Sequence, residues 1–169
     1  MIFRKARLHD VDAIMALVQS RIDWMNDVGL HQWNETDYFG RYPREYWERN
    51  IGSFLIGEVH GRVVVAIALY SEDVRWTRDG HYTGTHSGTA YYLHHLVTDP
   101  EAKGAGVEMM KYVEQYASAQ HIQLLRLDSA VGNKSLETYY TALGYSECGV
   151  CHDRLYHGVL REKRIATDG

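Results

Sequence analysis

The sequence predicts an α+β fold in which helices flank a mixed sheet. Three observations carry this prediction. Strand-like and helical hydrophobic patterns alternate along the chain, two strand-like runs are separated by only two residues, and the later helices stand between successive strands. The chain has 169 residues, which is long enough to bury a core without disulfide bonds. We therefore expect one domain over residues 1–169.

The first fifty residues predict a strand, a helix and a second, shorter helix. Residues 2–8 form a strand-like run, and apolar side chains recur at helical spacing over 10–28. The segment 29–42 has no period and several turn-forming residues, so we expect a polar loop that carries aromatic side chains. A proline opens the run 43–50, which is typical of the first turn of a helix.

A β-hairpin is predicted next. The runs 53–59 and 62–70 are strand-like, and only His60 and Gly61 separate them. The segment 71–89 that follows is polar and too long for a simple turn. We expect a flap or a mobile loop there.

Strands and helices alternate in the second half of the chain, where the hydrophobic period changes several times between two and 3.6. The predicted strands are 90–98, 124–130, 145–151 and 154–161, and the predicted helices are 107–120 and 133–144.

Composition and charge exclude several classes of protein. The net charge is -4 and the basic residues form no run, so a nucleic-acid partner is not expected. The longest apolar stretch, 63–70, is far shorter than the roughly 20 residues that a membrane-spanning helix needs. The amino-terminal residues lack the apolar middle of a secretory signal, so we expect a cytoplasmic protein without membrane contacts.

A glycine-containing turn joins the strand 90–98 to the next helix. Small residues at the start of a helix leave backbone N–H groups accessible, and such a turn can hold an anion. A flexible turn without a ligand explains the same residues about equally well. The residues of this turn are Lys103, Gly104, Ala105, Gly106 and Val107.

A second motif lies about thirty residues further on. Asn133 and Tyr140 are seven residues apart, which is two helical turns, and Gly144 and Tyr145 end the helix. With the preceding strand, glycine turn and helix, this pattern resembles the GNAT superfamily of N-acetyltransferases. The resemblance implies a mostly antiparallel central sheet of about seven strands, splayed at its middle and flanked by about four helices.

The resemblance also implies that acetyl-CoA is the co-substrate. The pantetheine arm would pair with the backbone of Leu96, Val97 and Thr98, and the pyrophosphate would lie on the amides of Gly104 to Val107, next to Lys103. Asn133 would contact the cofactor arm, and the Tyr140 hydroxyl would meet the thioester sulfur. Matching the two glycines of the turn places Glu101 where the family has Gln or Arg. A match that starts at Lys103 instead keeps a basic residue there but places Glu108 where the family has Gly or Ala.

The reaction that the resemblance implies is direct transfer of acetyl to a primary amine in a ternary complex. An amine with a pKa of ~10.4 is almost entirely protonated at pH 7, so a base or a water wire must remove a proton. A hydroxyl that protonates the departing thiolate also helps, and we expect Tyr140 to be this general acid. The alternative for Tyr140 is a helix tyrosine that packs its ring in the core. His94 and His95 are neighbours on one strand, so one of them is expected to face the cleft as the base. For each of them, packing on the sheet without a chemical role is the alternative.

The polar loop is the expected place for the acceptor. Trp33, Glu35 and Tyr42 are candidate substrate-binding residues, with ordinary loop anchoring and solvated charge as the alternative explanation. The acceptor would be a small molecule or a peptide. A catalytically silent acyl-CoA-binding sensor or interaction module is the alternative function, and a homodimer is compatible with the resemblance.

Cys148, Cys151 and His152 match the CxxCH pattern of covalent haem attachment. The pattern falls in a strand-like run, where two cysteines usually behave as small buried apolar residues. No second group of ligands has a matching spacing, so we expect neither haem nor a metal site.

Overall fold

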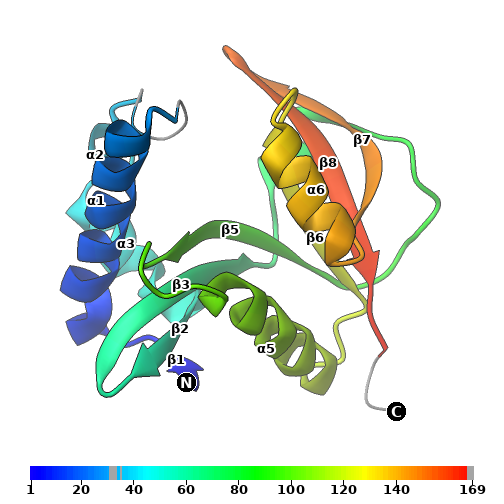
Figure 1. Ribbon diagram of the computed structural model, residues 1–169. Coiled ribbons are helices and arrows are strands. Elements are labelled where there is room, and N and C mark those ends of the chain that lie inside the picture. The colour runs from blue at the N-terminus through cyan, green and yellow to red at the C-terminus, as the bar shows by residue number, and fades with distance from the viewer. Residues whose placement is uncertain (31–33, 35, 167–169) are drawn as a thin grey trace. The chain divides into compact units, whose positions relative to one another are not determined.

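The computed structural model describes residues 1–30, 34 and 36–166. Within these residues it has the predicted α+β architecture, with eight strands and six α-helices (Figure 1). The strands are β1 (Ile2–Lys5), β2 (Phe54–Val59), β3 (Arg62–Tyr70), β4 (Gly80–Tyr82), β5 (Ala90–Thr98), β6 (Leu124–Ala130), β7 (Ser146–Asp153) and β8 (Tyr156–Arg164). The helices are α1 (Val11–Val28), α2 (Tyr38–Arg41), α3 (Arg44–Asn50), α4 (Val74–Thr77), α5 (Ala105–Ala119) and α6 (Lys134–Ala142).

The hydrogen-bonded order of the strands is β1-β2-β3-β5-β6-β8-β7-β4. Pairing is antiparallel for β1 with β2, β2 with β3, β6 with β8, β7 with β8 and β4 with β7, and it is parallel for β5 with β6. The expected mostly antiparallel sheet is therefore confirmed. The numbers of strands and helices exceed the predicted seven and four because α2, α4 and β4 have only three or four residues, too few to show a period.

The chain forms two compact units. The first comprises Met1–Leu69 and His95–Tyr112, and the second comprises Tyr70–His94 and Val113–Gly169. Strand β5 and helix α5 contribute to both. No helix in the described part of the chain is long and apolar enough to cross a membrane.

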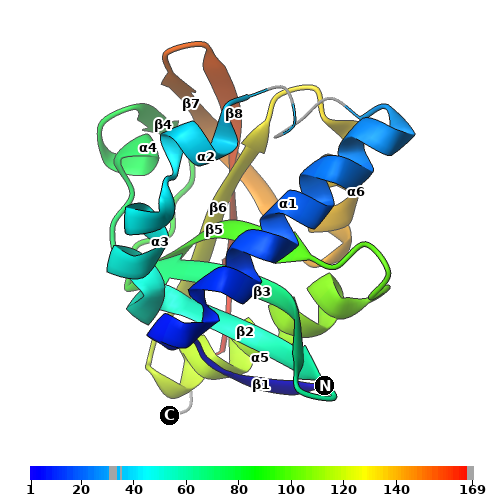
Figure 2. The same cartoon turned by 90° about the vertical axis from the view of Figure 1, so that its left-hand side faces the viewer.

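The first unit contains the predicted hairpin of β2 and β3. His60 and Gly61 connect the strands with φ angles of 50° and 74°. Left-handed conformations at both central positions are what a two-residue type I′ turn requires, so the predicted hairpin is confirmed. Helix α1 lies over the hairpin (Figure 2). Its buried residues follow the predicted helical period and are Val11, Ile14, Leu17, Val18 and Met25.

The second unit is built on the antiparallel strands β6, β8 and β7, with α6 beside them (Figure 1). Residues 71–89, where we expected a flap or a mobile loop, contain α4 and β4. Strand β4 pairs with β7 through Gly80 opposite Cys151 and Tyr82 opposite Gly149. The buried side chains beneath these elements are Trp76, Tyr92, Cys148, Cys151 and Leu160.

Candidate active site

The second half of β5 presents backbone groups to the edge that faces away from β3. The Asp99 amide donates to the Val64 carbonyl at 2.8 Å, so the backbone of Asp99 points toward β3. Backbone groups alternate in direction along a strand, so those of Val97 also point toward β3 and those of Leu96 and Thr98 point the other way. This edge suits an extended, amide-containing ligand.

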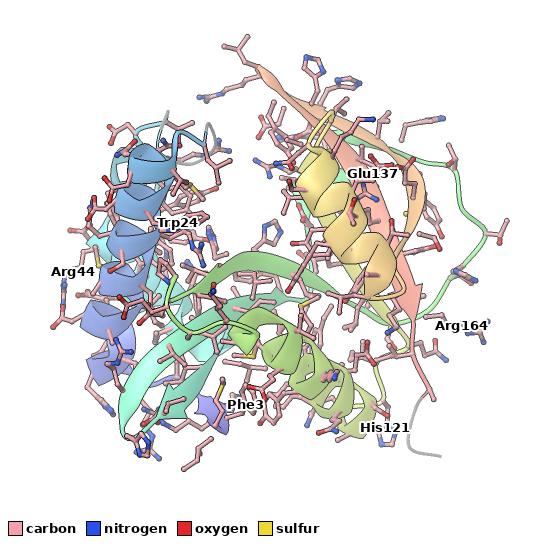
Figure 3. All side chains as sticks on the ribbon, in the orientation of Figure 1. Phe3, Trp24, Arg44, His121, Glu137 and Arg164 are labelled. Atoms are coloured by element: carbon pink, nitrogen blue, oxygen red, sulfur yellow. The ribbon has the colours of Figure 1, made fainter. Side chains whose placement is uncertain are left out.

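A guanidinium group is fixed at the end of this edge. Arg21 on α1 donates from Nε to the Thr98 carbonyl at 3.2 Å and from Nη2 to the Thr98 hydroxyl. The same guanidinium lies 4.7 Å from the ring centre of Trp24, which Figure 3 labels on α1. Burial lowers the pKa of Arg21 from its usual value. The residue therefore brings a partly desolvated cation to the last residue of β5, which the sequence did not indicate.

The turn after β5 is a tight, ordered loop. The Ala102 amide donates to the Asp99 carbonyl at 2.9 Å, and the Ala105 amide donates to the Ala102 carbonyl at 3.1 Å. Gly104 has a φ of +82°, and its carbonyl accepts the Glu108 amide at 3.0 Å.

The internal bonds of the turn limit which amides can meet a ligand. The predicted anion-binding amides ran from Gly104 to Val107, but that of Ala105 is used within the turn. The amides of Gly106 and Val107 precede the first helical hydrogen bond and remain at the helix start. The side chain of Lys103 is exposed, as is that of Glu101.

Helix α6 carries the second motif. Asn133 lies at the N-cap, where its side-chain oxygen accepts the Leu136 amide at 3.1 Å. It thus precedes the helix, although the sequence predicted that the helix would begin there. The role as a helix cap explains why an asparagine stands at position 133 without any ligand. The contact of Asn133 with a cofactor stays a prediction.

Tyr140 is partly buried among other aromatic rings of the second unit. Its ring centre lies 5.2 Å from that of Tyr139 and 5.9 Å from that of Tyr145. Burial raises the pKa of the Tyr140 hydroxyl above its usual value, and the nearby Tyr139 and Asp128 add to this effect. The phenol therefore holds its proton at neutral pH, as a general acid must.

The two adjacent histidines of β5 have different surroundings. His95 has a φ of +56°, which is uncommon for a residue other than glycine and interrupts the regular strand. Its Nδ1 lies 2.6 Å from the Tyr38 hydroxyl and its Nε2 lies 2.8 Å from the Tyr46 hydroxyl. The Tyr42 ring packs edge-on against the imidazole at 4.7 Å. His95 is thus enclosed by aromatic side chains of the first unit.

His94 belongs to a polar cluster in the second unit. Its Nε2 lies 2.6 Å from Oδ2 of Asp73. One potential ligand atom from each of His94, Asp73 and Asp128 lies within 4.8 Å of the others, so these residue types could hold a metal ion. A fixed cation is already present, because Arg75 Nη1 contacts Asp128 Oδ2 at 3.2 Å.

Sequence reasoning missed Asp73 and Asp128. Asp73 lies in the segment that was expected to be a flap or a mobile loop, and Asp128 looks like an ordinary polar residue of a strand. A helix-capping pattern could have indicated Asp73, since its Oδ1 accepts the Arg75 amide at 2.9 Å at the start of α4.

Among the predicted substrate-binding residues, Tyr42 packs against His95, whereas Trp33 and Glu35 lie outside the described residues.

The CxxCH segment has a structural explanation. Cys148 and Cys151 are buried free thiols, and burial raises their pKa values to about 12 and about 11. Thiols with such pKa values are protonated and unreactive at neutral pH. A Cβ on Gly149 would come within 2.0 Å of the His81 carbonyl oxygen, so this glycine allows β4 to approach β7 closely.

Comparison with known proteins places this arrangement in a family. The model of the acetyltransferase (GNAT) family matches residues 16–145. No curated protein matches the chain at a significant level.

Solved structures resemble the chain over nearly its whole length. A GNAT-family acetyltransferase from Listeria monocytogenes is 20% identical, with 97% of this chain and 94% of that one covered and a TM-score of 0.74. One from Streptococcus agalactiae is 17% identical, with 96% and 94% covered and a TM-score of 0.77. The PaiA N-acetyltransferase from Thermoplasma acidophilum, in complex with coenzyme A, is 16% identical, with 96% and 98% covered and a TM-score of 0.70. At sequence identities of 20% or less, the similarity to these structures shows that the chain shares their fold.

Proposed function

The chain belongs to the acetyltransferase (GNAT) family, and from this premise we propose that it transfers an acetyl group from acetyl-CoA to a primary amine. The amine belongs to a small molecule or a peptide and attacks the thioester directly in a ternary complex. The observation that carries this proposal is the outward-facing backbone edge of Leu96 and Thr98, which leads directly into the turn at Gly104.

The cofactor follows this edge and the turn. The pantetheine amides pair with the backbone of Leu96 and Thr98, beside Val97, and the pyrophosphate accepts hydrogen bonds from the amides of Gly106 and Val107. Gly104 supports the proposal because its left-handed conformation turns the chain into α5. The exposed ammonium of Lys103 and the guanidinium of Arg21 supply positive charge near the cofactor phosphates, which partly offsets the acidic Glu101.

The chemistry requires three proton transfers. The amine arrives as an ammonium ion, loses a proton to a base, and attacks the carbonyl carbon of the thioester. As the C–S bond breaks, the thiolate takes the proton of the Tyr140 hydroxyl, and the surplus proton of the new amide nitrogen passes through solvent to the Tyr140 oxygen, which restores the acid. The net reaction converts R–NH₃⁺ and acetyl-CoA into the N-acetyl amide, free CoA thiol and one proton. His94 and His95 are the candidate bases on β5.

Thiol release measured with a panel of primary amines tests the proposal. Tyr140→Phe removes only the proposed acid and should lower kcat by at least about tenfold, because positioned proton transfer is typically worth ~10² to 10⁴. Tyr139→Phe is the matched control, since it removes a neighbouring hydroxyl from the same helix, and it should stay within about twofold of the unsubstituted enzyme. Binding of acetyl-CoA without turnover of any amine would instead indicate the silent acyl-CoA-binding module.

A further inference from the structure

We propose that His152 and His157, which face each other across the hairpin of β7 and β8 (Figure 1), form a binding site for one divalent transition-metal ion such as Cu²⁺, Ni²⁺ or Zn²⁺. The proposal uses none of the residues assigned to acetyl transfer. It can therefore be tested independently of that reaction.

The two imidazole rings meet through the same nitrogen of each ring. Nδ1 of His152 lies 2.5 Å from Nδ1 of His157, the ring centres are 4.6 Å apart, and the ring planes are inclined by 79°. Nitrogens at this distance share one hydrogen, because two lone pairs or two hydrogens facing each other would repel. A metal ion that replaces this hydrogen receives a lone pair from each ring.

The backbone holds the two histidines at the closest spacing that a sheet offers. They are directly opposite each other in the register of β7 and β8. The His152 amide donates to the Asp79 carbonyl at 3.0 Å. The His157 carbonyl accepts the Val131 amide at 3.0 Å, so these backbone groups point away from the partner strand. This is the direction found in a non-hydrogen-bonded pair, whose Cα atoms are about 4.5 Å apart and whose side chains are closest.

Neighbours on both sides of the hairpin therefore fix the pair before any ion binds. Because the two strands are already joined and held from outside, binding an ion orders only two side chains. Ligands that are arranged in advance lose little conformational entropy on binding.

The pair lies on the face of the hairpin opposite to its buried side chains. Side chains alternate between the two faces of a strand, and Cys151 is buried whereas the adjacent His152 is exposed, as is His157. An ion can therefore reach the ring nitrogens and keep water molecules as its other ligands. The spacing of the CxxCH segment gave no reason to expect this site, because the second histidine lies beyond the turn, five residues away.

Imidazole nitrogen selects the class of the ion. Zn²⁺, Cu²⁺ and Ni²⁺ bind imidazole, whereas Mg²⁺ and Ca²⁺ prefer oxygen ligands. Metal–nitrogen distances of about 2.0–2.1 Å place two nitrogens on one ion roughly 3 Å apart. The rings must therefore separate by less than about 1 Å, which small rotations of exposed side chains provide. The ring that carried the shared hydrogen holds it on Nε2 instead, so both rings stay neutral and no proton is released.

The cluster in the core of the second unit is less suited to such an ion. Asp73, His94 and Asp128 offer one imidazole and two carboxylates, but the Arg75 guanidinium lies 3.2 Å from Asp128 Oδ2 and would repel a second cation. On the hairpin, the side chain of Arg154 is exposed, so solvent and salt screen its charge.

Paramagnetic broadening in ¹H–¹⁵N NMR spectra locates the ion. Substoichiometric Cu²⁺ should broaden first the amide signals of Val131, His152 and His157, because these groups lie closest to the proposed site. Broadening that begins instead at Asp73 and His94 would place the ion in the other cluster and overturn the inference. Broadening that spreads evenly over the ten histidines of the chain would overturn it as well.

Isothermal titration calorimetry with Ni²⁺ alone measures the affinity. His152→Gln and His157→Gln should each weaken binding by at least about tenfold, because two ligands on one scaffold hold an ion more tightly than one. The matched control is His121→Gln, which removes an exposed imidazole of the same unit just after α5, where Figure 3 labels it, and should leave the affinity unchanged. Unchanged affinity in both pair variants would contradict the proposal, as would binding of Mg²⁺ with equal affinity.

Thermal unfolding separates metal binding from effects on folding. Without metal, the substituted proteins should unfold at the midpoint of the unsubstituted protein, because exposed substitutions have small effects on stability. Ni²⁺ should then raise the midpoint of the unsubstituted protein and of His121→Gln more than that of either pair variant, since an ion that joins β7 to β8 stabilises the folded state. An equal rise in all four proteins would show that the ion binds elsewhere.

Discussion

At the residue scale, Gly104 is the position where the proposed cofactor turn is most sensitive to a side chain. Its φ is +82°, and a Cβ built there would meet no atom within 4 Å, so only the backbone conformation opposes substitution. An L-residue in this conformation costs roughly 1–2 kcal/mol. Gly104→Ala should therefore distort the turn and weaken acetyl-CoA binding by about tenfold in isothermal titration calorimetry.

Gly61→Ala is the control for this prediction. Gly61 has a φ of +74° with open space around it, so alanine causes a similar strain in the hairpin turn, away from α5. This variant should lose a similar amount of stability and keep its affinity for acetyl-CoA. Equal affinities of the two variants would argue against a role of the turn in binding.

Some of the functional residues could be predicted from the sequence, and others could not. Gly104 and Tyr140 belong to motifs with fixed spacing, so they were predicted. Asp73 was missed because its importance depends on His94, 21 residues further along the chain, and no local pattern connects them. Arg21 was missed for the same reason, since its partner Thr98 is 77 residues away.

At the scale of elements, substitutions at the start of helix α6 distinguish two roles of Asn133, the helix cap and the contact with the cofactor. Asn133→Ala removes the cap on the Leu136 amide and should lower the free energy of unfolding by about 1 kcal/mol, measured by urea denaturation. Asn133→Ser keeps a capping oxygen and should keep most of the stability.

Kinetics of the serine variant then isolate the cofactor contact. A raised KM for acetyl-CoA in stable Asn133→Ser supports a contact between the Asn133 amide and the cofactor arm. An unchanged KM would mean that Asn133 is only a helix cap.

Element prediction succeeded where a hydrophobic period extended over several turns or strand residues. Strands β5 and β6 have the predicted bounds, 90–98 and 124–130, because both are long and mostly apolar. Helix α4 and strand β4 have four and three residues, and β4 exists through its pairing with β7, so their formation depends on tertiary contacts that no local pattern shows.

At the scale of the whole molecule, the alternation of strands and helices indicated the fold, and two motifs within about fifty residues indicated the family. The acceptor is the part that sequence patterns describe least, because the polar loop 29–42 has neither a period nor a motif. Specificity for the acceptor depends on the arrangement of individual side chains. That Trp33 and Glu35 bind the acceptor stays a prediction.

Every proposed role of Gly104, Asn133 and Tyr140 depends on the binding of acetyl-CoA, and thermal unfolding with and without acetyl-CoA measures this binding. At a ligand concentration of about 100 times Kd, binding to the folded state should add about 2.7 kcal/mol of stability. For a chain of this size the midpoint Tm should then rise by roughly 5 °C. An unchanged Tm at millimolar acetyl-CoA would mean that the folded chain does not bind acetyl-CoA.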